Sequence, residues 1–292
     1  KPDLLDRVNI RPAPEHFYGA LDEQFIEDFQ FQMEPTTGPY VVKPENIEED
    51  VSVTLTRLPD WWANDKKFFR NRFNPDAQKI TVIRDPTKQF EVFRKGELDW
   101  YGLGLPKDWY DKLPDDDDRV ASGYLQKFQF YNEVPRPTWA VRLNSHHALL
   151  RDKNIRLGLH HAMNFAEVIK REFRGDYQRM NSVADGYGGR SHPTQKAREF
   201  SVSKARALFE QAGFNKAGGD GILENDKGQK LIFTFTTPYK RLQNVLVILK
   251  EEAEKCGVQL NLEILDRTAA WKKVDEKKHE IMLGALNTSV EL

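Results

Sequence analysis

Hydrophobic and polar residues alternate along several short stretches of the chain, which is typical of strands with one buried face. In "VSVTLTRL", residues 51–58, polar residues separate Val51, Val53 and Leu55. Residues 79–84 form a second stretch of this kind, "KITVIR". The two patterns predict two strands in the first half of the chain.

A helix is predicted directly after the second strand. Asp85 is a good N-cap and Pro86 suits the first helical position, because proline lacks the amide hydrogen that would be unsatisfied there. Phe90 and Phe93 fall on one face, and Gly96 is a natural C-terminal stop. The segment "ELDWYGL" then becomes extended again. This strand–helix–strand order predicts two parallel neighbouring strands in one sheet.

The second half of the chain shows stronger periodicity. Asp152 is predicted to cap one helix, and residues 203–212 are predicted to form another. A second strand–helix–strand unit is predicted from strand 230–236, helix 239–256 and strand 258–265. The helix that starts at Asp152 has this apolar face: Ile155, Leu159, Ala162, Met163, Ala166, Ile169 and Phe173.

Composition narrows the class of protein. The 292 residues are 39% hydrophobic and 30% charged, and 44 basic and 45 acidic residues give a net charge of −1. This balance lacks the basic character of a nucleic-acid binder, and no apolar run is long enough for a transmembrane helix. The single cysteine, Cys256, excludes an intrachain disulfide and a cysteine-based zinc site. The missing initiator Met indicates a processed or trimmed product.

Four of the seven histidines lie in "NSHHALLRDKNIRLGLHHAMN": His146, His147, His160 and His161. Adjacent histidines on a helix point about 100° apart, so the second pair cannot easily share one metal ion. We expect a solvated loop pair and a helix-surface pair, with no metal site. No G-x-S-x-G elbow, phosphate-binding loop or HExxH motif occurs either, so no catalytic residues and no enzymatic activity are expected.

Together the patterns predict a two-lobed α/β protein that holds a ligand between its lobes. We place the first lobe at residues 1–125 and the second at residues 126–292.

Several stretches resemble one known family in their order and spacing. They are "TTGPYVV", "VTLTRLPDWW", "FNPDAQKITVIRDPTKQFEVFRKGELDW", "LNSHHALLRDKNIRLGLHHAMN" and "SVSKARALFEQAGF". The resemblance is to the extracellular solute-binding proteins of family 5, the peptide- and nickel-binding receptors of bacterial ABC importers. It covers about residues 10–290, and it leans toward the subgroup with microcin C and oligopeptide receptors.

The resemblance implies a class II periplasmic-binding-protein fold that is incomplete at both ends, because family members are considerably longer. It implies a substrate-binding component of an importer that closes two lobes around a peptide or peptide-like solute. The implied partners are that solute and an inner-membrane ABC permease, with no nucleic acid and no cofactor. The implied location is the periplasm.

The resemblance also places three cleft-lining segments, which lie after "GELD", on the strand from Trp139, and at the chain end. Arg142 would favour an anionic ligand group such as a carboxylate, because its guanidinium can bind one in bidentate fashion. Trp100, Tyr101 and Trp139 have a structural alternative as core aromatics. The implied ligand-binding residues are Trp100, Tyr101, Gly102, Leu103, Gly104, Trp139, Arg142, Asn144, Asn287 and Ser289.

One departure from the family concerns peptide recognition. Peptide receptors of this family often bind the amino terminus of the ligand through an Asp after a Gly-Trp pair, and "GALNTS" has neither. Three alternatives remain open. One is a cytoplasmic ligand-sensing domain of a transcriptional regulator with the same fold. The others are a receptor for a metal complex or haem and a histidine-dependent, metal-assisted hydrolase.

Overall fold

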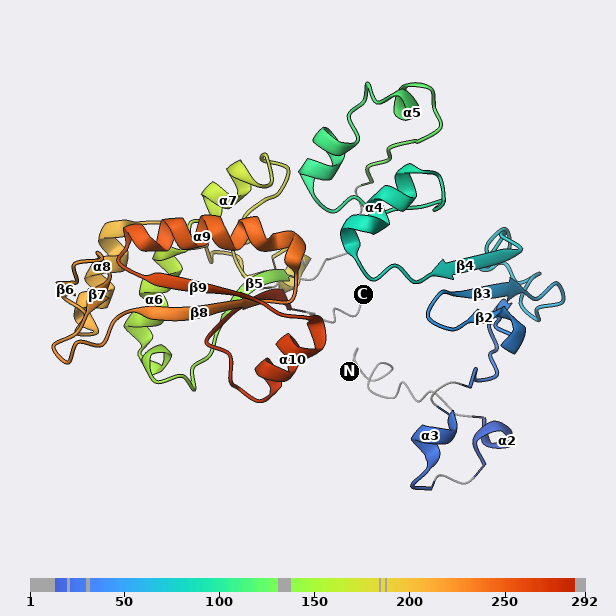
Figure 1. Ribbon diagram of the computed structural model, residues 1–292, viewed down its shortest axis with the longest axis horizontal. Coiled ribbons are helices and arrows are strands. Elements are labelled where there is room, and N and C mark those ends of the chain that lie inside the picture. The colour runs from blue at the N-terminus through green and yellow to red at the C-terminus, as the bar shows by residue number, and fades with distance from the viewer. Residues whose placement is uncertain are drawn as a thin grey trace. The chain divides into compact units, whose positions relative to one another are not determined.

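The computed structural model describes residues 14–19, 22–29, 32–130, 138–183, 185–186 and 188–286. The chain forms two compact units, Lys1–Gly102 (unit 1) and Leu103–Leu292 (unit 2), whose elements are labelled in Figure 1. The mixture of sheets and helices agrees with the predicted α/β class. The predicted lobes, 1–125 and 126–292, are a different division of the chain and stay a prediction.

Unit 1 contains a four-stranded sheet made of short strands. β3 (Ser52–Arg57) pairs antiparallel with β1 (Tyr40–Val41), β2 (Ile47–Glu48) and β4 (Ala77–Thr81). Both alternating stretches of the first half are therefore confirmed as strands. β4 is exposed at all five of its positions, so the described part of the chain covers neither face of the sheet at this strand.

α4 (Pro86–Arg94) begins where the sequence predicts, because the Asp85 side chain accepts a hydrogen bond from the Thr87 amide at 2.8 Å. Gly96, at φ 81°, follows the helix, as predicted for a C-terminal stop. The predicted parallel crossover is wrong. Residues 97–103 form no strand, and β4 pairs antiparallel with β3 rather than parallel with a later strand.

Unit 2 is built on a mixed sheet with the order β5-β10-β8-β9. β10 (Ile281–Leu286) pairs antiparallel with β5 (Thr138–Leu143) and parallel with β8 (Ile232–Thr237). β9 (Gln259–Ile264) pairs parallel with β8, and α9 (Gln243–Lys255) connects them. The second predicted strand–helix–strand unit is therefore confirmed.

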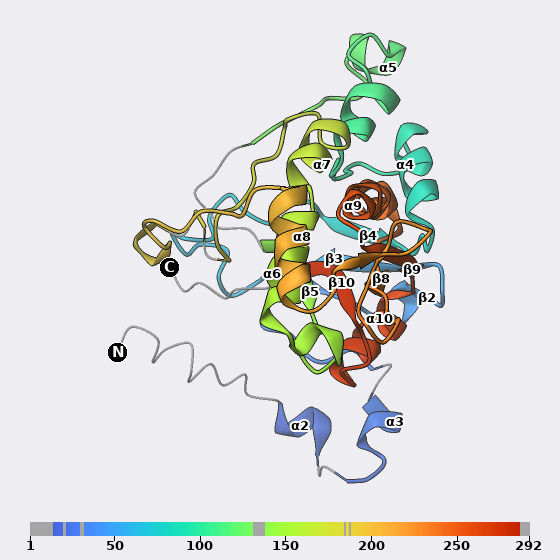
Figure 2. The same ribbon diagram turned by 90° about the vertical axis from the view of Figure 1, so that its left-hand side faces the viewer.

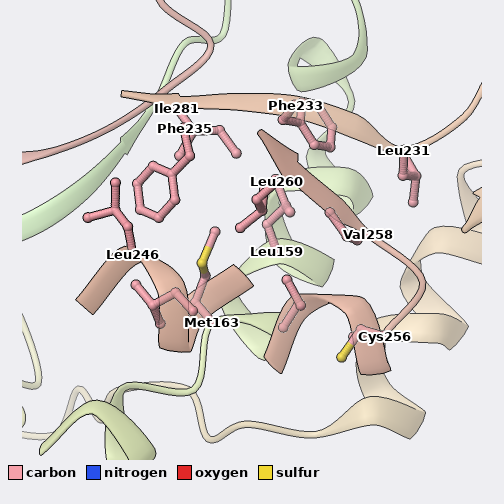
Figure 3. Close-up of a cluster of buried hydrophobic side chains, with 14 of the residues drawn as sticks. Leu159, Met163, Leu231, Phe233, Phe235, Leu246, Cys256, Val258, Leu260 and Ile281 are labelled. Atoms are coloured by element: carbon pink, nitrogen blue, oxygen red, sulfur yellow. The ribbon is translucent and has the colours of Figure 1, made fainter. Parts of the chain in front are cut away.

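Helices cover both faces of this sheet, since α9 lies along one face and α10 (Arg267–Asp275) lies on the other (Figures 1 and 2). α6 (Lys153–Ala162) and α8 (Val202–Gln211) pack against each other and contribute to the same core as α9. Figure 3 shows the centre of this core. Its side chains include Leu159, Met163, Leu231, Phe233, Phe235, Leu246, Cys256, Val258, Leu260 and Ile281.

Asp152 caps α6 as predicted, with its side chain accepting from the Asn154 amide at 2.6 Å. The helix was expected to continue to Phe173, and this is wrong. Met163 takes an extended conformation at ψ 96° and ends the helix. Asn164 then caps a second helix, α7 (Phe165–Arg171), by accepting from the amide three residues later.

Short helices and strands complete the described part of the chain. They are α2 (Glu15–Tyr18), α3 (Phe25–Phe29), η1 (Pro44–Asn46), η2 (Asp108–Lys112), α5 (Asp118–Ala121), η3 (Leu149–Arg151), η4 (Gly188–Arg190), β6 (Lys216–Ala217), β7 (Leu223–Glu224) and η5 (Lys240–Leu242). Among all the described residues, no helix is long and apolar enough to cross a membrane.

Candidate ligand-binding site

Unit 2 contains a cavity of about 810 Å³ beside the core face of its sheet. The size is within the range of small-ligand sites, which are mostly apolar with a few polar groups at set positions. Its apolar lining comes from strands β5 and β10 and from helices α6, α7 and α9. Representative side chains are Val141, Leu143, Met163, Ile169, Val245 and Leu283.

The pleat of β5 decides which of its side chains face the cavity, since successive residues of a strand point to opposite faces. Trp139 and Val141 lie on the cavity face, with the Trp139 ring 4.8 Å from that of Tyr239. Arg142 lies on the other face, where its guanidinium is 5.0 Å from the Trp271 ring of α10. It also donates to the backbone carbonyl of Ala285 at 2.8 Å. A role for Arg142 in ligand binding stays a prediction.

The described residues between α7 and α8 form a wall of the cavity, mainly through 177–183 and 195–198, and hydrogen bonds attach this wall to the rest of unit 2. The Thr138 hydroxyl at the start of β5 donates to the carbonyl of Val183 at 2.5 Å. At the other end, the His161 ring nitrogen Nδ1 lies 2.8 Å from the carbonyl of Glu199. The wall is therefore attached to the rest of unit 2 at two points, Val183 and Glu199.

Hydrogen bonds within the wall stabilise its conformation. The Asp185 carboxylate accepts from the backbone amide of Asn181 at 2.6 Å, and the Asn181 side-chain oxygen accepts from the amide of Ala197. The hydrogen bonds that Asp185 accepts lower the pKa of its carboxyl, with the one from the Asn181 backbone amide as the largest cause. The Asp185 carboxylate thus accepts hydrogen bonds from within the wall.

Tyr177 connects the wall to the segment that opens unit 2. Its hydroxyl donates to the carbonyl of Gly104 at 2.9 Å, and its ring lies 4.6 Å from that of Phe173. Burial raises the pKa of the Tyr177 hydroxyl, so this group remains a hydrogen-bond donor at neutral pH.

The charged side chains in the described lining of the cavity are all basic. Burial lowers the pKa of His160, and the positive charges of Arg198, Arg179 and His161 lower it further. The His160 ring is therefore neutral at pH 7, since its ordinary pKa is already close to 6.5. The other basic groups of the lining are Arg179, Lys196, Arg198 and Arg241.

Two of the ligand-binding residues predicted from the sequence, Gly104 and Trp139, line this cavity. Asn144 is buried, and its side-chain amide donates to the carbonyls of Lys277 and His279, so it joins β5 to the segment before β10. Leu103 begins unit 2 but does not line the cavity. Asn287 and Ser289 lie outside the described residues.

The remaining three predicted residues belong to unit 1. The Trp100 side chain is 83% exposed, and Gly102 is exposed as well. Tyr101 packs against Phe90 and Phe93, with ring centroids 5.5 and 5.6 Å apart. This packing matches the core-aromatic alternative for Tyr101, and the binding roles of all three residues stay predictions.

The histidine pairs have separate environments. His147 is half-buried against the Phe233 ring, with its Nε2 3.9 Å from the Glu280 carboxylate, so the expectation of a solvated side chain is wrong there. His146 is exposed as expected. Within the described ranges, no three His, Cys, Asp or Glu side chains are grouped as a metal site would require.

Comparison with known proteins explains the fold. The family model for bacterial extracellular solute-binding proteins, family 5 Middle, matches residues 10–291. The chain belongs to this family. Its members are binding proteins, and the sequence resemblance is therefore confirmed.

The similar proteins are distant in sequence but share the fold. A Brucella suis protein is 24% identical over 287 aligned positions, covering 87% of this chain and 46% of that protein. The oligopeptide-binding protein AppA of Bacillus subtilis, solved with a nonapeptide, superposes with a TM-score of 0.68 at 19% identity, covering 95% of this chain and 52% of AppA. NikZ of Campylobacter jejuni, solved with Ni(L-His), superposes with a TM-score of 0.73 at 20% identity, covering 99% of this chain and 53% of NikZ. The chain spans about half the length of these proteins.

Proposed function

We propose that this chain supplies part of the substrate-binding component of a bacterial ABC importer, and that the component binds peptides or peptide-like solutes. Two observations support the proposal: membership in the solute-binding family and the cavity of about 810 Å³ beside β5. AppA, a relative over most of this chain, is an oligopeptide-binding protein. The cavity carries the proposal because its apolar lining and few polar groups suit a small organic solute.

The proposed activity is binding without turnover, outside the cytoplasmic membrane, with an inner-membrane permease as the partner. Closure of two lobes by hinge bending would enclose the solute, as in other two-lobed receptors. No observation favours the alternative of a cytoplasmic regulator domain.

The test is affinity selection of a mixed tripeptide library on the full chain, followed by thermal unfolding with the enriched peptides. A ligand that binds only the folded state raises the unfolding midpoint. At a ligand concentration of 100 times its Kd, the free energy of unfolding increases by about 2.7 kcal/mol. Trp139→Ala is expected to weaken the best peptide about tenfold or more, since aromatic side chains often dominate small-ligand contacts.

Trp62→Ala is the matched control, because Trp62 is a 66% exposed tryptophan of unit 1 that does not line the cavity. Arg142→Ala and Tyr101→Ala in the same titration test two residues that the family resemblance places in the cleft. A library from which nothing is enriched, with no change in the unfolding midpoint, would contradict the receptor function.

A further inference from the structure

The cavity of unit 2 carries charge of one sign. Its lining includes three arginines and a lysine, Arg179, Arg198, Arg241 and Lys196, and the described residues of the lining include no Asp or Glu. All four cations keep exposed side chains, whereas the apolar residues beneath them include buried Leu159, Val245 and Leu283. The cavity thus combines an apolar floor with a basic rim.

Within the described ranges, the arginines of this rim have no carboxylate counter-ions. Among the described residues, no ion pair or side-chain hydrogen bond involves Arg179, Arg198 or Arg241. Elsewhere in unit 2 the pattern differs, since Arg171 pairs with Glu251 at 2.9 Å and Arg174 pairs with Asp111. Unpaired charges of one sign around a low-dielectric concavity focus a positive potential that attracts anions.

Two acidic side chains of the wall, Glu199 and Asp185, have partners of their own. Glu199 pairs with Lys204 at 2.6 Å, on α8. Asp185 accepts two hydrogen bonds from Asn181. Neither carboxylate lines the cavity. Lys196 is close enough to Asp185 for its positive charge to lower the pKa of that carboxyl, whereas no described carboxylate pairs with the three arginines of the rim.

Contacts within the lining prepare Arg179 for an anion. Its guanidinium lies 4.2 Å above the Phe165 ring, and such stacking leaves the planar edge of the group free to donate hydrogen bonds. Arg179 and Arg198 both line the same cavity as His160 of α6, and the positive charge of each depresses the pKa of that histidine, so each lies within electrostatic reach of it. An anion bound to Arg179 and Arg198 would offset the repulsion between their two positive charges.

We propose that the cavity binds a solute with an apolar body and a carboxylate, and that Arg179 and Arg198 bind the carboxylate. The inference rests on the proposed receptor function and specifies the chemistry of its ligand. Arginine can donate two parallel hydrogen bonds to a carboxylate, and such charge-assisted pairs are about twice as strong as neutral ones. The floor beside Trp139 accommodates the apolar body. For a peptide ligand, the free carboxyl terminus supplies the anion.

The first experiment titrates the full chain, by calorimetry, with the tripeptide most enriched in affinity selection and with the same peptide amidated at its carboxyl terminus. Amidation is expected to weaken binding about tenfold or more, equivalent to about 1.4 kcal/mol. The double variant Arg179→Gln/Arg198→Gln should weaken the acid form by a similar factor and abolish the difference between acid and amide. Arg151→Gln, an exposed arginine of unit 2 outside the cavity, is the control and should change neither affinity.

The second experiment does not depend on peptides. It compares 8-anilinonaphthalene-1-sulfonate, an anionic aromatic dye, with the neutral N-phenyl-1-naphthylamine by fluorescence titration. The double variant is expected to lose about tenfold in affinity for the anionic dye and to keep its affinity for the neutral dye within about twofold.

The outcomes separate the two proposals. Equal affinity for the acid and amide peptides would overturn the carboxylate site and leave the receptor function standing. Arginine-dependent binding of the anionic dye, with no peptide bound, would support an anion site and remove the peptide-receptor function. If no peptide binds and the double variant binds both dyes like the unmodified chain, both proposals fall.

Discussion

The sheets of the two units differ in what covers them. In unit 1 the strands are antiparallel, and all five residues of β4 are exposed. In unit 2 the parallel pair β8 and β9 has α9 on one face and α10 on the other (Figure 1). Parallel strands occur almost only where both faces are covered, whereas antiparallel sheets tolerate a solvated face.

The difference extends to the buried side chains. Among the described residues of unit 1, the buried apolar side chains are Trp61, Ala63 and Phe90. Unit 2 buries a contiguous cluster that includes Phe209, Phe233, Phe235, Leu249 and Leu260. Burial of apolar surface contributes about 25 cal/mol per Å², so we infer that stability is concentrated in unit 2. The candidate cavity therefore lies on the better-packed unit, where its lining is held in place before a ligand arrives.

The largest difference in stability between the units is expected when a large core side chain is removed. Phe235 is fully buried on β8, and Phe235→Ala is expected to destabilise the chain by about 3–5 kcal/mol because it leaves a cavity that the core cannot fill. Ile80→Ala on β4 is the matched substitution in unit 1. Since Ile80 is 58% exposed, the expected change is within about 0.5 kcal/mol.

The measurement is urea unfolding followed by circular dichroism, with each unit monitored by hydrogen exchange of its own strands. If Ile80→Ala lowered the free energy of unfolding as much as Phe235→Ala does, unit 1 would be packed as tightly as unit 2. The contrast between the units would then be lost.

A smaller effect is expected where two helices of unit 2 approach closely. A Cβ added at Gly158 of α6 would clash with the ring of Phe209 on α8, and Phe209 is fully buried. Alanine normally favours a helix over glycine by about 1 kcal/mol. Here we expect Gly158→Ala to destabilise by about 1–3 kcal/mol, because overpacking outweighs helix propensity.

Gly219→Ala is the control for this substitution, since a Cβ there meets nothing within 4 Å and Gly219 has no positive φ. It should leave the unfolding midpoint nearly unchanged. A Gly158→Ala protein more stable than the unmodified chain would show that α6 and α8 separate easily, against the packing described for unit 2.

The same contrast explains which elements the sequence predicts. The β8–α9–β9 crossover is predictable because the alternating strands and the apolar helix face repeat over long segments. The first crossover is not, because "ELDWYGL" holds apolar residues without a pairing partner: Trp100 is 83% exposed, and residues 97–103 form no strand. The break at Asn164 has a signal that the apolar periodicity hides. Asn164 and Glu167 have the spacing of a capping box.

The candidate site is less predictable than the fold. Gly104 and Trp139 follow from the family resemblance, whereas the basic rim comes from irregular segments and short turns distant in sequence. No periodicity places Arg179, Arg198 and Arg241 around one cavity, since tertiary packing alone brings them together. The sequence predicts that Arg142 binds an anionic group of the ligand. Because side chains alternate between the two faces of β5, Arg142 points to the face of the sheet that packs against α10.

The smallest expected effect compares one helix cap in each unit. Asp85 caps α4 in unit 1, and Asp152 caps α6 in unit 2, each by accepting a backbone amide of the first turn. Replacement of either by Ala should destabilise its helix by about 1 kcal/mol. Asp85→Ala should reduce hydrogen-exchange protection of α4 about fivefold and leave α6 unchanged, and Asp152→Ala should do the reverse, since the two units are separately packed. Asp→Asn at each position keeps an accepting oxygen and should retain most of the protection. If Asp85→Ala reduced protection in α6 as much as in α4, the units would unfold as one, and the difference in their packing would not produce a difference in local stability.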